Sequence, residues 1–455
     1  MESLSAYSNR FQDGSRLLFN RHVAPTLPYW IAGGLTGLVA SAYAALFRRL
    51  SAFSERFFSE HFATWALAVP VLFFASRALV VFFSPSSSGS GIPQVMSAIE
   101  SLEHCGESWL KKILGFRMIL VKVLSSTVMV LAGGAIGREG PTIHIGAGLF
   151  LMVEDFFRGR KFILRKDPTA SRKAFILAGG AAGIAAAFNT PLGGIVFAIE
   201  ELATDSFKQF RTTVITGVIV AGVTAQALVG SYLYLGTPTI PKVTGLAIAE
   251  AAILGIVAGG AGAFFGRSLF RLLKWRREWT GWKKETAWVL SCSALFIGLA
   301  AASGGYSLGG GSEGIGRILF ENQSVSFIHA PIRFISTQLC YLVGGAGGIF
   351  SPALSIGANL GAWLAQLVPA FQADSHLLVL AGMAAFLTGV THAPFTSLVL
   401  VLEMTNKSSA IFSLMLATMA AHWISKAIDT GSFYERVQES FFNPQRTPDP
   451  APHDR

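Results

Sequence analysis

The chain has 455 residues, of which 52% are hydrophobic and only 14% are charged, and its formal net charge is +10. A soluble protein of average composition has about 25% charged residues, so this composition excludes an ordinary soluble domain. Uncharged runs long enough to cross a bilayer recur along the chain, which predicts an all-α polytopic membrane protein. A membrane β-barrel is disfavoured because the runs are continuous rather than alternating. The basic residues cluster in short loops, which fits the positive-inside rule better than nucleic-acid binding.

Three parts are expected along the chain. Residues 1–27 predict an amphipathic segment on the cytoplasmic surface, residues 28–437 a membrane domain, and residues 438–455 a short disordered cytoplasmic tail. The three cysteines are far apart and show no pairing or metal-ligand spacing. The expected apolar segments of the membrane domain are, in chain order, Trp30–Phe47, Phe62–Phe83, a segment that begins at Met118 and runs into the glycine-rich stretch Gly133–Gly148, Ala174–Leu202, Thr213–Gly236, Thr244–Gly266, Trp288–Leu308, Phe334–Gln372, His376–Leu402 and Ser408–Ser425.

A dense group of basic residues lies between Arg267 and Lys284, directly after one of these segments. Such a density beside a membrane span predicts a cytoplasmic loop. Elsewhere, four segments contain too much glycine and proline for straight spans, and they begin near Gly133, Ala178, Gly344 and Ala381. In hydrocarbon, an interrupted helix is tolerated only where its freed backbone is buried in protein or lines a wet cavity. These four segments therefore predict a functional site within the membrane domain, and not only a bundle of helices.

Two pairs of segments repeat within the chain. Gly133–Gly148 matches Gly344–Asn359 at 8 of 16 positions after a shift of 211 residues. Ala178–Leu202 matches Ala381–Thr405 at 7 positions after a shift of 203 residues. Two such matches in the same order predict an internal duplication, with repeats at about residues 28–237 and 244–437. Repeats with broken helices and a site at their interface are typical of secondary transporters.

Three stretches share a glycine-rich turn followed by a proline and an apolar helix. Proline is favoured in the first turn of a helix, and glycine lets the backbone approach a small ligand closely. Each stretch therefore offers free N–H groups and the positive end of a helix dipole. Several such ends would bind an anion without a full positive charge, and Ser90 would add a hydroxyl donor. The stretches are Gly89–Pro93 (GSGIP), Gly137–Pro141 (GREGP) and Gly347–Pro352 (GGIFSP).

Glu139 is the exceptional residue of these stretches, because a charge in the middle of a bilayer costs about 2.5–3.5 kcal/mol. When ionised, its carboxylate can occupy an anion position at the helix end, and when protonated it can leave that position. Glu139 is therefore predicted to be a proton-linked gate. The alternative is a salt bridge with the neighbouring Arg138, although adjacent residues rarely face each other on a helix. Arg138 is expected to pair elsewhere or to hold carbonyl groups.

Glu200, Glu201 and Glu403 lie at the ends of apolar helices. Each is either solvated at the membrane interface or part of a proton path. The adjacent pair Glu200 and Glu201 is the better candidate for a proton relay, because it follows an otherwise uncharged run.

His144 and Lys122 are two further polar residues within apolar segments. His144 lies just over one helical turn after Glu139, and a role in helix packing is favoured over a proton relay. Lys122 is expected to pair with an acid such as Glu100, because an unpaired ammonium group is costly in hydrocarbon.

An enzymatic function is disfavoured. Gly305–Gly309 and Gly310–Gly314 both match GxSxG, but that motif needs a strand, a turn and a helix to present a nucleophile. Both matches lie in or beside a glycine-rich loop after a membrane span. HExxH and Cys/His metal patterns are absent from the sequence, so neither a metal site nor a membrane hydrolase is expected.

Together, GSGIP, GREGP and GGIFxP resemble the anion-site motifs of the CLC chloride channel and transporter family, and the resemblance covers about residues 30–437. It implies an inverted-repeat fold with many tilted and broken helices, and a homodimer with a separate pore in each subunit. It also implies voltage-sensitive, proton-coupled chloride transport in a bacterial inner membrane, with both termini cytoplasmic. Chloride and protons would be transported without a cofactor. A passive chloride channel on the same fold is the alternative.

The same resemblance implies roles for individual residues. Glu139 would be the external gating glutamate. Glu201 would be the internal proton-transfer glutamate of the exchanger branch, which true channels lack. The chloride ligands would be the hydroxyl groups of Ser90 and Tyr434 and the backbone amides of Ile349 and Phe350.

Overall fold

The computed structural model describes residues 26–158, 168–202, 207–230, 234–240, 244–279, 281–367 and 374–442. Over these residues the regular structure is helical, apart from two isolated β-bridges between loops, which confirms the all-α class. Seven helical stretches in the described part of the chain are long and apolar enough to cross a membrane. This agrees with a multi-pass membrane protein. The N-terminal segment predicted at residues 1–27 lies almost entirely outside the described residues.

The helices of the first half are α2 (Leu27–Glu60), α3 (Phe62–Phe83), η2 (Pro85–Ser87), α4 (Ile92–Glu100), α5 (Glu107–Leu114), α6 (Phe116–Leu131), α7 (Glu139–Phe157), α8 (Pro168–Phe188), α9 (Pro191–Phe197), η3 (Ala198–Leu202) and α10 (Phe207–Val229). Those of the second half are α11 (Gly245–Arg277), α12 (Trp282–Ala302), α13 (Ser312–Phe320), α14 (His329–Leu342), α15 (Phe350–Leu367), α16 (Ser375–Thr391), α17 (Pro394–Thr405), η5 (Ser408–Ala410), α18 (Ile411–Ile428), α19 (Phe433–Val437) and η6 (Gln438–Phe442).

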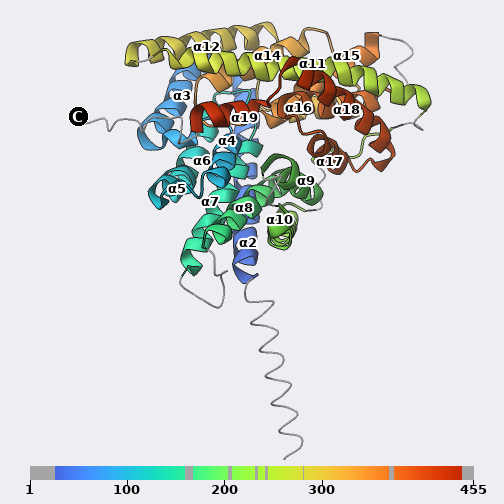
Figure 1. The fold of residues 1–455 in the computed structure, drawn as a ribbon. Coiled ribbons are helices and arrows are strands. Elements are labelled where there is room, and N and C mark those ends of the chain that lie inside the picture. Colours follow the sequence, from blue (N-terminus) through green and yellow to red (C-terminus); the bar gives the residue numbers. More distant parts are fainter. Residues whose placement is uncertain are drawn as a thin grey trace, which may run out of the picture.

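The two halves of the chain occupy different parts of the molecule. Most helices of the first half, coloured blue to green, lie in the lower part of Figure 1, and the yellow to red helices of the second half lie above them. The halves meet at several places, among them the contacts of α7 with α15, of α9 with α17 and of α3 with α12. The candidate site lies at the first of these meetings.

The packing of the first half recurs in the second. Helix α10 packs against α2 and α8, and α8 packs against α7; in the same way α18 packs against α11 and α16, and α16 packs against α15. Backbone angles also recur at positions that the sequence repeats align. Gly133 and Gly344 both have a φ of 81°, while Asn189 and His392 have φ values of 57° and 61°.

Glycines let the two largest helix contacts form through backbone atoms. A Cβ on Gly146 of α7 would collide with the carbonyl of Gly179 in α8, and a Cβ on Gly357 of α15 would collide with the carbonyl of Gly382 in α16. Small residues at such crossings allow membrane helices to approach closely. The same contact is therefore made once in each half, at positions related by the sequence repeats.

Several predicted boundaries differ from the structure. Helix α2 continues through Arg48 and Arg49. Most of the basic run predicted as a loop lies in α11, as far as Arg277, and Lys283 and Lys284 lie in the first turn of α12, because arginine and lysine are good helix formers and extend their charges to solvent. The predicted span His376–Leu402 is two helices, with His392 in a left-handed conformation just before Pro394. The predicted disordered tail begins with the short helix η6, and its remainder lies outside the described residues.

Candidate anion and proton site

The three glycine-rich loops are joined by backbone hydrogen bonds. The N–H of Gly89 donates to the carbonyl of Gly345 at 2.8 Å, and the N–H of Gly347 donates to the carbonyl of Gly89 at 3.1 Å. Gly137 and Gly348 exchange two such bonds, at 2.7 and 2.8 Å. The loop before α15 therefore lies between the loops that precede α4 and α7. This arrangement brings three helix N-termini to one place.

Two buried hydroxyl groups lie near these helix ends. Ser90 is 1% exposed and Tyr434 is fully buried, yet neither Ser90 Oγ nor the Tyr434 hydroxyl forms a hydrogen bond with a described residue. The two side chains lie within interaction range of each other. Ser90 Oγ also lies over Gly140 of α7, where a Cβ would collide with it. Buried hydroxyls normally have partners, so these two fit a small ligand that accepts hydrogen bonds.

Ile349 and Phe350 stand at the beginning of α15, and each is 1% exposed. Amide groups at this position have no acceptor within their own helix. The ring of Phe350 packs against Phe188 and Phe197 of the first half, with ring centroids 6.0 and 6.4 Å apart. This aromatic packing fixes the end of α15, and with it the direction of the two amides.

Glu139 is the first residue of α7 and is only 1% exposed. Its Oε1 accepts hydrogen bonds from Ser351 Oγ at 2.6 Å and from the Tyr234 hydroxyl at 3.3 Å. Its Oε2 is buried without a partner among the described residues, and it lies over Gly137, where a Cβ would collide with it. The carboxylate is therefore folded back over the end of its own helix.

Arg138 is not a close partner of Glu139. Its Nε lies 4.0 Å from Glu139 Oε1, which is longer than a hydrogen bond. The guanidinium also approaches the carbonyl of Ala187 at 3.5 Å and lies 5.8 Å from the centre of the Tyr234 ring. The ion pair considered from the sequence exists only at this long distance, and Arg138 approaches a carbonyl group as expected.

Glu201 lies in the short helix η3, which follows α9. Its Oε1 is buried without a partner in the described part of the chain. The carboxylates of Glu435 and Glu200 act on it through space. Tyr434 lies within electrostatic range of both Glu201 and Glu139. The structure thus places Glu201 and Glu139 around the same tyrosine.

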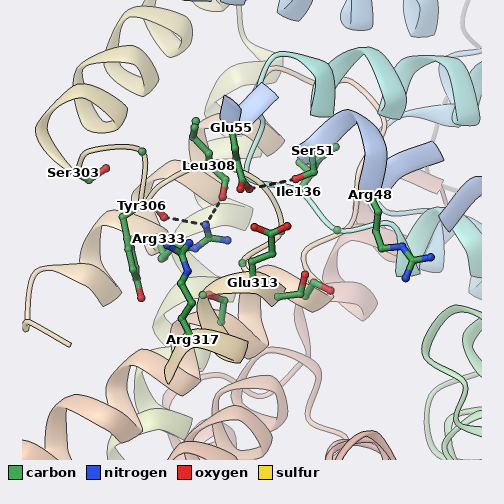
Figure 2. A pocket seen from close by; sticks show the side chains of 18 of the residues that line it. Arg48, Ser51, Glu55, Ile136, Ser303, Tyr306, Leu308, Glu313, Arg317 and Arg333 are labelled. Carbon is green, nitrogen blue, oxygen red and sulfur yellow. Dashed lines mark hydrogen bonds between the residues drawn. The ribbon is translucent and has the colours of Figure 1, made fainter. Parts of the chain in front are cut away.

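A cavity of about 430 Å³ reaches Glu139. Arg138, Tyr234 and Ser351 line it beside the carboxylate, together with residues of α2, α13 and α14. Figure 2 shows the charged side chains that extend into this cavity from those three helices. Ions and water therefore have room to approach Glu139 from this side.

Lys122 does not pair with Glu100, so that prediction is wrong. Lys122 is fully buried, and its Nζ donates to the carbonyl of Gly89 at 3.0 Å. Glu100 instead accepts a hydrogen bond from Gln438 Nε2 at 2.6 Å. A buried ammonium group needs an acceptor, and a loop carbonyl fills that need here. The sequence shows the lysine but does not show that an irregular loop lies within its reach.

His144 packs between helices, as expected. It is fully buried, and its Nε2 donates to the carbonyl of Ile113 at the end of α5 at 3.0 Å. Its ring also lies against Gly91, at the start of α4. His144 therefore fixes α7 to the loop that carries Ser90.

Three residues near the site were missed from the sequence. Ser351 and Tyr234 hold Glu139, and the Tyr341 hydroxyl accepts a hydrogen bond from the Ser90 N–H at 3.3 Å. Ser351 carried a signal, because it is the variable position of GGIFxP and aligns with Gly140 in the repeat. Tyr234 and Tyr341 belong to no motif that was singled out, so only the fold reveals them.

Comparison with known families identifies the chain. The family model described as voltage gated chloride channel matches residues 72–426, more than half of the sequence. The chain belongs to this family, the CLC chloride channels and transporters. A CLC protein of Salmonella paratyphi A, named H(+)/Cl(-) exchange transporter ClcA, is 30% identical over 462 residues that cover 94% of this chain and 91% of the relative. The ClcA protein of Salmonella typhi matches equally well.

Solved CLC structures share the fold. The structure of a slow cyanobacterial Cl-/H+ antiporter superposes with a TM-score of 0.77 at 23% identity, and covers 92% of this chain and 98% of its own. A CLC-type fluoride/proton antiporter gives a TM-score of 0.73 at 22% identity, with coverage of 91% and 97%. The expected CLC-type helical fold is therefore confirmed.

Proposed function

We propose that this CLC protein exchanges chloride for protons across a bacterial inner membrane. The observation that carries the proposal is Glu139, a buried carboxylate held at a helix end near two hydroxyl groups that have no partner among the described residues. A carboxylate at such a place competes with an anion for the same donors. Its protonation then becomes linked to anion binding. The names of the Salmonella relatives, which describe H(+)/Cl(-) exchange, support the same function.

In this proposal, chloride lies between the hydroxyls of Ser90 and Tyr434 and the backbone amides of Ile349 and Phe350. These donors carry no full charge, so the site binds an anion without preventing its release. Chloride is the cargo, and the exchange requires no cofactor. The two hydroxyl groups, which have no hydrogen-bond partner among the described residues, would then be satisfied whenever chloride is bound.

Glu139 acts as the gate and proton carrier on the side of the cavity. When ionised, it occupies an anion position over Gly137; when protonated, it leaves that position and admits chloride. Glu201 is the second group that transfers protons, on the cytoplasmic side of the site. Chloride moving one way and protons moving the other transfer charge in the same sense. The membrane potential therefore acts on the exchange, which accounts for the proposed voltage sensitivity.

The test is proton movement in liposomes that contain the purified protein. A chloride gradient without a pH gradient should drive protons uphill. Glu139→Gln should abolish proton movement, and Glu201→Gln should suppress it while chloride flux continues. Glu60→Gln is the matched control, because Glu60 is exposed, does not line the described wall of the cavity and bonds to Arg56. Robust chloride flux without proton movement in the wild type would instead establish the alternative, a passive channel.

We also propose that the protein is a homodimer with one pore per subunit. Large apolar side chains are exposed on α9, α10, α17 and α18, which lie together at one side of the fold. They include Leu192, Val223, Phe395, Phe412 and Trp423. Single-molecule photobleaching of labelled protein in liposomes should show two steps per particle, and a single step would contradict the dimer. Leu192→Glu should lower the dimer fraction.

We also propose the orientation of the protein in the membrane and its internal duplication. In this proposal the C-terminal end of α11 and both termini face the cytoplasm, and the basic last turn of α11 supports this by the positive-inside rule. Labelling of single cysteines at the two ends of α11 in intact cells tests this. The recurring glycine contacts and backbone angles support repeats at about residues 28–237 and 244–437.

A further inference from the structure

The cavity that reaches Glu139 holds two further carboxyl groups among its described lining residues. They are Glu55 of α2 and Glu313 in the first turn of α13. The exchange proposed above uses neither of them. A cavity of about 430 Å³ has room for several water molecules, since one water occupies about 30 Å³ in the liquid. Protons can therefore move between these groups and Glu139.

Glu55 and Glu313 point toward each other in the cavity, as Figure 2 shows. Ser51, one turn earlier in α2, donates a hydrogen bond to Glu55 Oε1 at 3.5 Å. Two facing carboxylates repel each other when both are ionised. Sharing one proton removes this repulsion. The pair is therefore suited to hold a proton.

Positive groups in the same cavity oppose this effect. Arg333 and Arg317 both act on Glu55 through space. Arg333 is 2% exposed, and its guanidinium donates to three loop carbonyls at 2.7, 2.8 and 3.2 Å, so the backbone fixes its position. Arg317 and Arg48 are exposed, where solvent and salt weaken their field. These charges favour the ionised form of Glu55, so the pair can also release its proton.

Tyr306 and His329 are further titratable groups on the described wall of the cavity. Their rings stack with centroids 4.1 Å apart, and the Tyr306 hydroxyl donates to Asn359 Oδ1 at 2.6 Å. Burial raises the pKa of Tyr306, so its hydroxyl stays neutral. These two residues are therefore engaged with each other and with α15 rather than with the carboxyl pair.

The three carboxyl groups differ in their access to solvent. Glu313 is exposed, Glu55 is partly buried, and Glu139 is 1% exposed. Glu139 Oε2 is buried without a partner in the described structure, so it can accept a proton. The order Glu313, Glu55, Glu139 thus leads from the solvent to the gate.

We propose that Glu55 and Glu313 share one proton and pass it through the cavity to Glu139. The proposal rests on the exchange function above and names the proton donor on this side. In the step, an O–H bond of the pair breaks, water in the cavity carries the proton, and an O–H bond forms at the Glu139 carboxylate. Glu313, being exposed, then takes a new proton from the solvent.

The test compares coupled exchange rates in liposomes at low and high pH. At about pH 8 solvent protons are scarce, so Glu55→Gln and Glu313→Gln should each lower the rate roughly tenfold. At about pH 5 protons reach Glu139 directly, and both variants should remain within about twofold of the wild type. The ratio of chloride to protons should not change, because the gate itself is intact. Glu321→Gln is the matched control, since Glu321 is exposed at the other end of α13.

A second measurement keeps the inference separate from the exchange function. If the wild type moves no protons, the exchange fails, but the carboxyl pair can still be examined by infrared difference spectroscopy. The wild type should show a carboxyl C=O band that titrates with pH and disappears in Glu55→Gln. Rates that match the Glu321→Gln control at every pH would overturn the relay. A titrating band that persists unchanged in both variants would overturn the shared proton.

Discussion

Glu200, which follows α9, caps the N-terminus of α17, and Glu403, near the end of α17, caps the N-terminus of α9. The carboxylate of Glu200 accepts hydrogen bonds from two N–H groups in the first turn of α17, at 3.1 and 2.7 Å. The carboxylate of Glu403, at the end of α17, accepts two from the first turn of α9, at 3.1 and 2.7 Å. Each glutamate satisfies donors that a helix leaves free. The two residues are therefore bound to backbone groups across the meeting of the two halves, and they occupy equivalent positions in the predicted repeats.

Because the two caps are reciprocal, removing either one should lower the stability of the protein by the same amount. Glu200→Ala and Glu403→Ala should each lower the free energy of unfolding by about 1–2 kcal/mol, since each leaves two helical N–H groups without an acceptor. Thermal unfolding in detergent measures the effect. Glu60→Ala serves as the control, because that glutamate forms an exposed ion pair with Arg56. A change in one variant alone would show that the two caps are not equivalent.

Ser351 is predicted to strengthen the hold on Glu139. Ser351→Ala removes the 2.6 Å bond to Oε1 and leaves the longer bond from Tyr234. In the proposed function the carboxylate competes with chloride, so weakening its hold by about 1 kcal/mol should raise the apparent chloride affinity roughly fivefold. Isothermal titration calorimetry measures this. Ser355→Ala, one turn further along α15, should leave the affinity unchanged, and an equal effect in both variants would contradict the assignment.

The close helix contacts predict that alanine destabilises the protein at Gly146 and Gly357 but not at Gly34. Gly146→Ala and Gly357→Ala place a methyl group against a backbone carbonyl of the neighbouring helix, and each should destabilise the protein by about 1–3 kcal/mol. Gly34 of α2 has nothing within 4 Å of an added Cβ, so Gly34→Ala should be neutral or stabilise by up to about 1 kcal/mol. Melting temperatures of the three variants in detergent check this, and similar shifts in all three would contradict the close contacts.

Lys122 is predicted to position the Ser90 loop. Lys122→Met removes the bond from Nζ to the carbonyl of Gly89, and it should weaken chloride binding by about 1–2 kcal/mol, or roughly five- to thirtyfold. Lys122→Gln keeps a donor and should recover part of the affinity. Calorimetric titration with chloride measures both variants. If the two variants bind chloride equally weakly, the ammonium charge rather than the hydrogen bond is responsible.

The loops of the site could be predicted because their chemistry is local. Glycine, proline and Glu139, a charged residue in an apolar segment, lie within a few positions of one another, so the sequence shows a helix end that exposes N–H groups. The expectation that three such ends lie together, as in CLC proteins, agrees with the hydrogen bonds that join Gly89, Gly137 and Gly348 to their neighbours.

The partners of these groups could not be predicted because they are distant in the chain. Ser351 and Tyr234 are 212 and 95 residues from Glu139, and the donors to Glu200 are about 195 residues away. Local propensity carries no information on such pairs. The prediction that Lys122 pairs with Glu100 was wrong for the same reason. The acceptor of Lys122 is a backbone carbonyl, and because every residue has one, the sequence does not show which carbonyl is used.

The contacts of Gly146 with Gly179 and of Gly357 with Gly382 have a consequence for alternating access. Helices that touch through their backbones have no intervening layer of side chains that can rearrange to let one helix slide past the other. Sliding of α7 over α8, or of α15 over α16, would drive carbonyl groups into Cα atoms. The frame around the site is therefore stiff. During opening and closing, α7 with α8 and α15 with α16 are each expected to move as one rigid pair, without sliding of one helix over its partner.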